Sequence, residues 1–156
     1  MNEPKVITRT AAGYGEDFHA WSADQAARLR RSRPSSIDWE NIAEEIESLG
    51  KRDRRKVASD LNKILEHLIK WRYRPEKRKA GWRSSIREHR DRIERIIADS
   101  PSLSALPGEA LSEEYRKARD AALDDTGLSV DRIPRRCPFS IEQVLDPAYW
   151  PEADSG

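Results

Sequence analysis

The sequence predicts an all-α protein, a bundle of about four main helices with a short C-terminal helix. Apolar residues recur at helical spacing along almost the whole chain, and no segment of four or more residues alternates as a strand would. Hydrophobic and charged residues each make up 37% of the 156 residues, so we expect a small core and a large charged surface. This length suits one domain, placed at residues 15–150, with a loose N-terminal arm over 1–14 and a loose tail over 151–156.

The first helix is predicted over residues 17–31 and is closed by Pro34. Its apolar face comprises Phe18, Trp21, Gln25 and Leu29. A second helical stretch begins at Asp38, a favourable N-cap, with Ile37 placed to pack on Ile42 as a hydrophobic staple. It ends before Pro75, because a proline excludes the preceding residue from helical geometry.

The apolar stripe of this second stretch is interrupted by a hydrophilic segment around Gly50. It comprises Trp39, Ile42, Ile46 and Leu49 before the interruption, and Val57, Leu61, Ile64, Leu68 and Trp71 after it. The stripe keeps its helical phase across the interruption. One long helix kinked near Gly50 and two separate helices therefore both fit the sequence.

Three more helices follow. The third, over 81–99, has a bundle seam with spacings of four, three, four and three, formed by Trp82, Ile86, His89, Ile93 and Ile96. Ser100 and Pro101 open a short turn that we expect to break at "LPGEA". The fourth helix carries Leu111, Tyr115, Ala118 and Ala122 on one face and stops at Gly127, and the short fifth is predicted from a capping box of Ser140 and Gln143, with Phe139 and Val144 as its staple.

Several classes of function lack their sequence signature. The chain has no apolar run long enough for a membrane span and no secretory signal, so we expect a cytoplasmic protein without membrane contact. The single cysteine, Cys137, has no metal-ligand spacing around it and no partner for an internal disulfide. The glycines form neither a phosphate-binding loop nor a dinucleotide fingerprint, and a diiron bundle would need a second pair like Glu16 and His19. We therefore expect no cofactor, no metal and no catalytic residue.

One enzyme interpretation stays open. Glu45, His67 and His89 form a candidate buried polar network, since each lies on or near an apolar stripe, and a zinc site built on the histidines is the alternative to plain core hydrogen bonding. Glu45 is expected to pair with Arg72 or Arg83. An enzyme would bring Glu45, His67 and His89 together in one pocket.

The strongest functional candidate is the basic elbow, which we define as residues 70–92. It carries ten Lys or Arg residues and follows an acidic segment over 38–48. Trp71 and Trp82 fall on apolar stripes and are expected in the core, which leaves Tyr73 as the exposed aromatic side chain. The candidate partner-binding residues are Tyr73, Arg74, Lys77, Arg78, Lys79, Arg83 and Arg87.

Three roles for the basic elbow make different structural predictions. A binding module leaves Arg78, Lys79, Arg83 and Arg87 exposed and unpaired, whereas a purely structural role pairs the arginines with the acidic segment. We expect a non-enzymatic protein-interaction module with a protein partner or self-association. Nucleic acid is the alternative partner, through phosphate contacts and base stacking.

Four segments, in their order and spacing, resemble a known bacterial family. They are "DFHAWSADQAARLR", "DWENIAEEIESLGKRDRRKVASDLNKILEHLIKW", "YRPEKRKAGWRSSIREHRDRIERIIADSPSL" and "CPFSIEQVLDPAYWP". Together they are similar to domain of unknown function 29, over about residues 16–151. The resemblance implies a small helical protein of cyanobacteria and proteobacteria. It implies no activity and supplies no catalytic or binding residue.

Overall fold

Four long helices, one short helix and two 3-10 turns make up the computed structural model, which describes residues 13–31 and 38–154. In chain order they are α1 (Phe18–Arg31), α2 (Trp39–Tyr73), η1 (Pro75–Lys77), α3 (Ala80–Asp99), η2 (Pro101–Leu103), α4 (Leu106–Thr126) and α5 (Ile141–Leu145). No strand occurs among these residues. The predicted all-α class is confirmed, as are four main helices and a short fifth.

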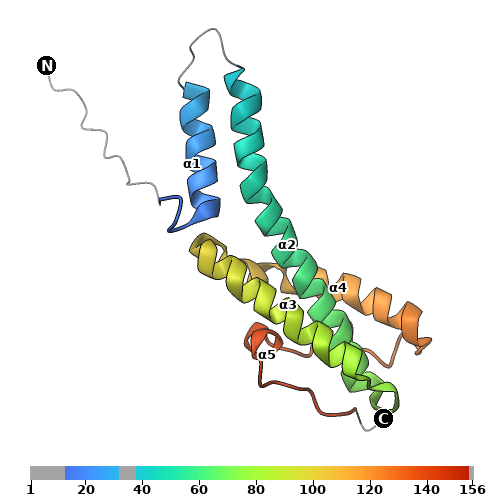
Figure 1. Cartoon of the computed structure of the whole chain (residues 1–156). Coiled ribbons are helices and arrows are strands. Elements are labelled where there is room, and N and C mark those ends of the chain that lie inside the picture. The colour runs from blue at the N-terminus through green and yellow to red at the C-terminus, as the bar shows by residue number, and fades with distance from the viewer. Residues whose placement is uncertain (1–12, 32–37, 155–156) are drawn as a thin grey trace, which may run out of the picture.

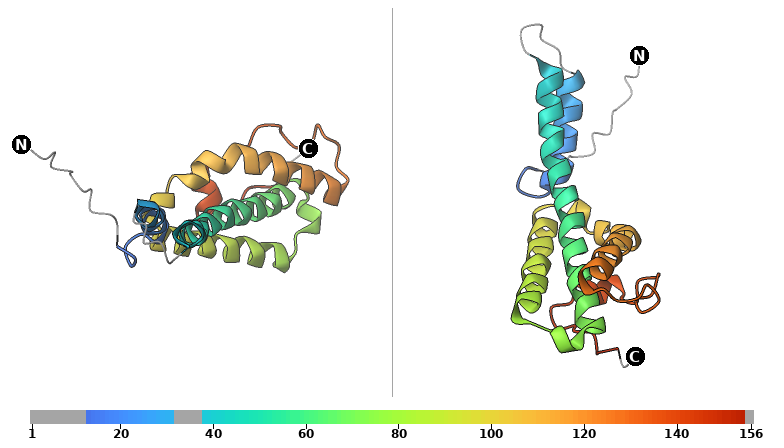
Figure 2. Two further views of the ribbon diagram at one scale, coloured as in Figure 1. Left: turned by 90° about the horizontal axis from the view of Figure 1, so that it is seen from above. Right: turned by 90° about the vertical axis from the view of Figure 1, so that its right-hand side faces the viewer.

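Helix α2 is the central helix of the molecule, and it shows that the stretch around Gly50 is one helix and not two. It runs without interruption for 35 residues, which corresponds to about 52 Å. The side chain of Asp38 caps it by accepting from the backbone N–H of Asn41, and it ends before Pro75 as predicted. Its first half pairs with α1 alone, and its second half lies between α3 and α4 (Figures 1 and 2).

The hydrophobic core lies entirely around the second half of α2. It consists of Val57, Leu61, Ile64, Leu65, Leu68, Ile69, Tyr73, Ile86, Ile93, Leu103, Leu106, Tyr115, Ala118, Ala122, Ile133, Phe139 and Val144. We call this part of the protein the body. No residue of α1 belongs to this core cluster.

The chain after α4 wraps around the body and closes it. Gly127 ends α4 in the left-handed region with φ 65°, as predicted. Ser140 and Gln143 form the predicted capping box of α5, and Phe139 and Val144 are buried. Residue 154, expected in a loose tail, is anchored because its N–H donates to the carbonyl of Arg72 over 2.9 Å.

The break expected at "LPGEA" is wrong. Helix α4 already begins at Leu106, and Pro107 stands in its first turn, where the missing proline N–H costs no intrahelical hydrogen bond. Leu106 and Pro107 are both buried. The proline therefore starts the helix instead of interrupting it.

The first half of α2 and helix α1 form an antiparallel hairpin that projects from the body (Figure 1). We call residues 13–31 and 38–56 the arm. Its two helices approach closely through small buried residues: Ser22, Ala26, Ala43 and Gly50. A Cβ on Gly50 would lie 2.2 Å from Oγ of Ser22, so the glycine serves this close approach rather than a kink. The predicted staple of Ile37 on Ile42 lies outside the described residues, because Ile37 is not among them.

Polar contacts fasten the base of the arm to the body. Asp17 caps α1 through the N–H of Ala20 over 2.8 Å and also accepts from the hydroxyl of Ser102 over 3.0 Å. The backbone N–H of His19 donates to the buried hydroxyl of Ser100 over 3.1 Å. Nδ1 of the His19 ring lies 3.0 Å from the carbonyl oxygen of Gly50. The arm is thus joined to the body in two ways: by these hydrogen bonds at its base, and by helix α2, which runs through both parts.

Candidate functional site

Five cations of the basic elbow lie exposed around η1 and the first two turns of α3: Lys77, Arg78, Lys79, Arg83 and Arg87. None of them forms an ion pair with a carboxylate in the described part of the chain. The guanidinium of Arg78 instead donates to the carbonyl of Trp71 over 2.8 Å. This arrangement is the one that a binding module requires.

Aromatic rings underlie these cations. The guanidinium carbons of Arg83, Arg87 and Arg90 lie 5.0, 5.9 and 5.5 Å from the centre of the Trp150 ring. The ring centres of Trp150 and Trp71 are 5.0 Å apart. The arginine side chains are therefore ordered on a tryptophan surface by cation–π contacts.

The structure corrects the expectation that Trp71 and Trp82 belong to the core. Both are half-buried and stand outside the core cluster. The guanidinium of Arg78 lies 4.7 Å from the ring centre of Trp71, and the ammonium of Lys79 lies 5.6 Å from that of Trp82. Each ring thus supports a cation of the elbow.

Arg90 holds Trp150 in place from below. It is buried, and its guanidinium donates to the carbonyls of Val144 over 2.8 Å and Tyr149 over 3.1 Å. These bonds tie the chain beyond α5 to α3, and burial lowers the pKa of the Arg90 guanidinium. Arg90 is a positioning residue, because its bonds go to the backbone of its own chain.

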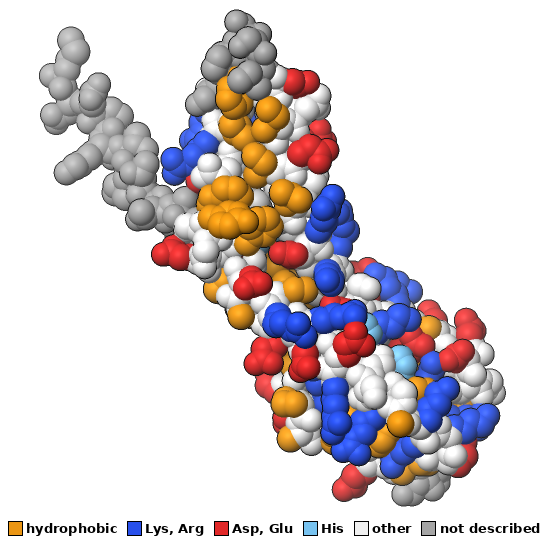
Figure 3. Space-filling model, viewed as in Figure 1, with side chains coloured by type: hydrophobic (Ala, Val, Ile, Leu, Met, Phe, Trp, Pro, Cys, Tyr) orange, Lys and Arg blue, Asp and Glu red, His pale blue; other side chains and the backbone are white. Residues whose placement is uncertain are grey.

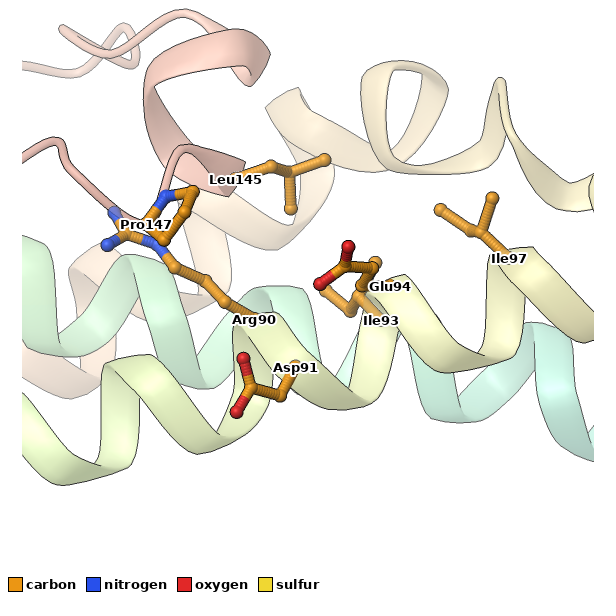
Figure 4. Close-up of a pocket in the computed structure, with 7 residues that line it drawn as sticks. All are labelled: Arg90, Asp91, Ile93, Glu94, Ile97, Leu145 and Pro147. Carbon is orange, nitrogen blue, oxygen red and sulfur yellow. The ribbon is translucent and has the colours of Figure 1, made fainter.

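Beside Arg90 lies a largely apolar groove of about 350 Å³ between α3 and α5 (Figure 4). Its lining residues are Arg90, Asp91, Ile93, Glu94, Ile97, Leu145 and Pro147. No cation of the elbow other than Arg90 borders it, and the Arg90 guanidinium is engaged with backbone carbonyls. The groove is thus separate from the exposed cations.

A second, more polar groove of about 620 Å³ lies next to Trp150, lined by Arg72, Tyr149, Trp150, Glu152, Ala153 and Asp154. The half-buried Arg72 has no carboxylate partner in the described residues, and its Nε is buried without a hydrogen bond. The carboxylate of Asp154 is already paired with Arg132 over 3.2 Å. The groove is therefore lined by a guanidinium that has no carboxylate partner among the described residues.

Two of the predicted partner-binding residues are not available to a partner. The sequence predicts an exposed Tyr73, but this residue is 6% exposed and belongs to the core cluster, which also includes Ile133 and Phe139 from the chain after α4. Arg74 donates to the carbonyl of Thr126 at the end of α4 and to Glu76 over 3.1 Å. Tyr73 and Arg74 therefore stabilise the fold.

The predicted polar network of Glu45, His67 and His89 does not form. Glu45 is exposed on the arm, about 33 Å from His67 along the continuous helix α2. The expected pairing of Glu45 with Arg72 or Arg83 is wrong. Arg72 lies still farther along α2, and Arg83, in α3, forms no ion pair with a described carboxylate. Nδ1 of His67 lies 2.8 Å from the carbonyl oxygen of Lys63 in the same helix, and burial lowers the pKa of the His67 imidazole.

Two polar clusters that the sequence does not predict occupy the body instead. Nδ1 of His89 lies 2.6 Å from Oδ1 of the buried Asp60. Lys70, only 4% exposed, donates to Glu66 over 2.8 Å and to Asp125. The spacing of four residues along α2 indicates the pair of Glu66 and Lys70. The partners from other helices, His89 of α3 and Asp125 of α4, cannot be inferred from nearby sequence.

Other described side chains give no sign of a metal centre or membrane span. Within residues 13–31 and 38–154, no three His, Cys, Asp or Glu side chains group in a way that would hold a metal ion. Each described helix is too short or too polar to traverse a bilayer.

Comparison with known proteins places the chain in a family. The model of a family described as "Domain of unknown function DUF29" matches residues 14–150. The chain belongs to this family. A crystal structure of an alpha-helical protein of unknown function from Rhodospirillum rubrum ATCC 11170 shares the fold of this DUF29 protein, with a TM-score of 0.69 and 26% identity over 88% of this chain and 91% of that chain. A search among curated proteins gives no match.

Membership confirms the resemblance seen in the sequence. Neither the DUF29 description nor that of the Rhodospirillum rubrum protein states an activity or a ligand.

Proposed function

We propose that this DUF29 protein is a protein-interaction module that binds an acidic segment of a partner protein at the basic elbow. The observation that carries the proposal is the set of guanidinium groups around Trp150, namely Arg72, Arg83 and Arg87, which lack carboxylate partners among the described residues. A folded protein normally pairs such groups or leaves them to water on mobile side chains.

Packing on tryptophan prepares these arginines for binding. The guanidinium groups of Arg83 and Arg87 lie against Trp150, so less side-chain entropy is lost when a carboxylate is bound. Arg72 stands in the groove on the side of Trp150 that Tyr149 and Ala153 line. Arginine and tryptophan together are the residues that most often dominate the energy of protein interfaces.

The same geometry favours a protein segment over nucleic acid. Base stacking needs an open aromatic face, but Tyr73 is buried and cations lie over Trp71, Trp82 and Trp150. The groove also presents the carboxylate of Glu152, which repels a phosphate backbone. A protein segment can place an acidic residue at Arg72 and a neutral or basic one at Glu152.

The test is binding of a fluorescent peptide of about ten residues in which glutamates alternate with neutral residues, followed by anisotropy at about 50 mM salt. We expect the double variant Arg83→Glu/Arg87→Glu to weaken binding by at least about tenfold, because each lost charge-assisted contact is worth about 1 kcal/mol or more. The matched control is Arg54→Glu/Arg55→Glu, which makes the same change of charge on exposed residues of the arm.

Two results would refute the proposal. Equal weakening in the control would show that only net charge matters. Tighter binding of a thymidine oligonucleotide of matched charge, lost in the elbow variant, would assign the surface to nucleic acid instead.

A further inference from the structure

The groove between α3 and α5 has a fixed apolar lining. Ile93 is buried, and Ile97 and Leu145 are half-buried and pack against the core cluster. Leu145 and Pro147 face α3 across the groove (Figure 4). Arg90, whose guanidinium donates to backbone carbonyls, forms the end nearest the basic elbow. With a volume of about 350 Å³, the groove admits a large apolar side chain while the core stays closed.

Two carboxylates line the groove without a paired cation. Asp91 and Glu94 are exposed and form no ion pair with a described residue. Arg87 and Arg95 stand four residues before and after Asp91, which is the spacing of a helical ion pair. The guanidinium of Arg87 lies against Trp150 instead, and that of Arg95 donates to the backbone carbonyl of Asp91 over 3.3 Å. The two carboxylates are therefore available to a cation from outside the chain.

The exposed arginines of the elbow and this groove share one face of α3. Arg83, Arg87 and Asp91 follow one another at intervals of four residues, and Glu94 and Ile97 continue the same face at intervals of three. Figure 3 shows Asp and Glu side chains interspersed with Lys and Arg over the body. A segment that runs along this face thus meets two arginines, then two carboxylates and then an apolar groove.

We propose that the partner segment bound at the basic elbow continues along α3 into this groove, where a basic residue faces the two carboxylates and a large apolar side chain enters between α3 and α5. The inference rests on the proposed function and specifies the chemistry of the same partner segment. Charge complementarity supports it, because a segment that stays acidic would bring like charges to Asp91 and Glu94. Continuity supports it as well, because the arginines and the groove lie on one face of one helix.

The spacing along α3 suits an extended segment. Four helix residues rise about 6 Å, and two residues of an extended chain span about 6.6 Å, with alternate side chains on the same side. The pattern Glu-x-Glu-x-Lys-x-Leu therefore matches the helix turn by turn. Its glutamates reach Arg83 and Arg87, and its lysine reaches Asp91. Its leucine then lies between Ile93 and Ile97, in the groove.

The test uses a fluorescent lysine peptide, Leu-Ser-Lys-Ser-Glu-Ser-Glu-Ser-Lys-Ser-Leu, with binding followed by anisotropy at about 50 mM salt. The peptide carries the pattern in both chain directions, so the result does not depend on its orientation along α3. Replacing both leucines by serine should weaken binding at least about fivefold, because no apolar side chain is then removed from water. Both peptides have the same charges, so this difference reports the apolar contact alone.

A charge cycle places the peptide lysines on the protein. The lysine peptide is compared with a glutamine peptide in which both lysines are replaced, and the ratio of the two affinities is measured for each protein variant. In Asp91→Asn/Glu94→Gln this ratio should shift against the lysine peptide by at least about threefold relative to wild type. The matched control Glu44→Gln/Glu45→Gln removes two exposed carboxylates of the arm and should leave the ratio within about 1.5-fold. Circular dichroism checks that each variant keeps its helix content.

Two results would overturn the inference. One is equal affinity for the leucine and serine forms of the peptide, and the other is a ratio that Asp91→Asn/Glu94→Gln leaves unchanged. The peptide of alternating glutamates and neutral residues tests the elbow separately, because it carries neither lysine nor leucine. If that peptide depends on Arg83 and Arg87 while the groove measurements fail, the proposed function stands and only this inference falls. If that dependence is absent, both fall.

Discussion

Replacing Gly50 by alanine tests whether close packing of α1 on α2 holds the arm together. In an exposed helix interior this change is favourable by about 1 kcal/mol, because glycine is a poor helix former. At Gly50 the new Cβ would meet Oγ of Ser22 at 2.2 Å and Nδ1 of His19 at 3.2 Å. Overpacking of this kind costs about 2 kcal/mol, so we expect a net loss of about 1 kcal/mol and a fall in Tm of about 3 °C.

The assay is thermal unfolding followed by circular dichroism, with two companion variants. Gly81→Ala is the matched control: Gly81 also lies in a helix, and a Cβ there meets nothing within 4 Å, so Tm should rise by about 2 °C. Adding Ser22→Ala to Gly50→Ala removes the clashing oxygen and should recover most of the loss. The packing argument is refuted if Gly50→Ala raises Tm as Gly81→Ala does, or if Ser22→Ala brings no recovery.

Three further predictions concern the body and the base of the arm. Lys70→Met leaves Glu66 without its buried partner and should lower the free energy of unfolding in urea by about 2 kcal/mol, whereas an unchanged urea midpoint would contradict a structural role. Burial raises the pKa of Asp17, but hydrogen bonds from Ala20 and Ser102 outweigh it and hold the pKa below its usual value. Its stabilisation is therefore present at neutral pH and lost as pH falls through the folded pKa, so Asp17→Asn should narrow the difference between urea midpoints at pH 7 and about pH 3. Tyr115→Phe removes the 2.6 Å hydrogen bond from the Tyr115 hydroxyl to the carbonyl of Pro134 and should lower the free energy of unfolding in urea by about 1 kcal/mol. An unchanged free energy of unfolding would show that the bond does not stabilise the fold.

The parts of the fold that depend on local signals could be predicted from the sequence. Asp38 caps α2, Gly127 ends α4 and Ser140 opens α5, because each acts through bonds to residues a few positions away. Gly50 could not be assigned in this way, since a glycine in a helical pattern reads the same whether it bends the helix or admits a neighbour. Only the position of Ser22 across the hairpin decides it.

The candidate site could be predicted only in part, for a related reason. Exposure of Arg83 and Arg87 follows from the charge and periodicity of α3. The roles of Tyr73 and Trp150 depend on where the chain after α4 travels, and no local pattern encodes that path. Tyr73 and Phe139 share one core cluster, and the residues after Phe139 bring Trp150 under the guanidinium of Arg83.

The division of one continuous helix between two environments has a consequence for hydrogen exchange. Opening of the arm separates α1 from α2 without disturbing the core cluster, which begins at Val57. Without α1 the first half of α2 has no packing partner and unfolds locally, so its amides before Gly50 exchange, whereas those from Leu61 to Ile69 exchange only when the body unfolds. The backbone of α2 thus divides into fast and slow exchanging halves, although no residue interrupts its helix.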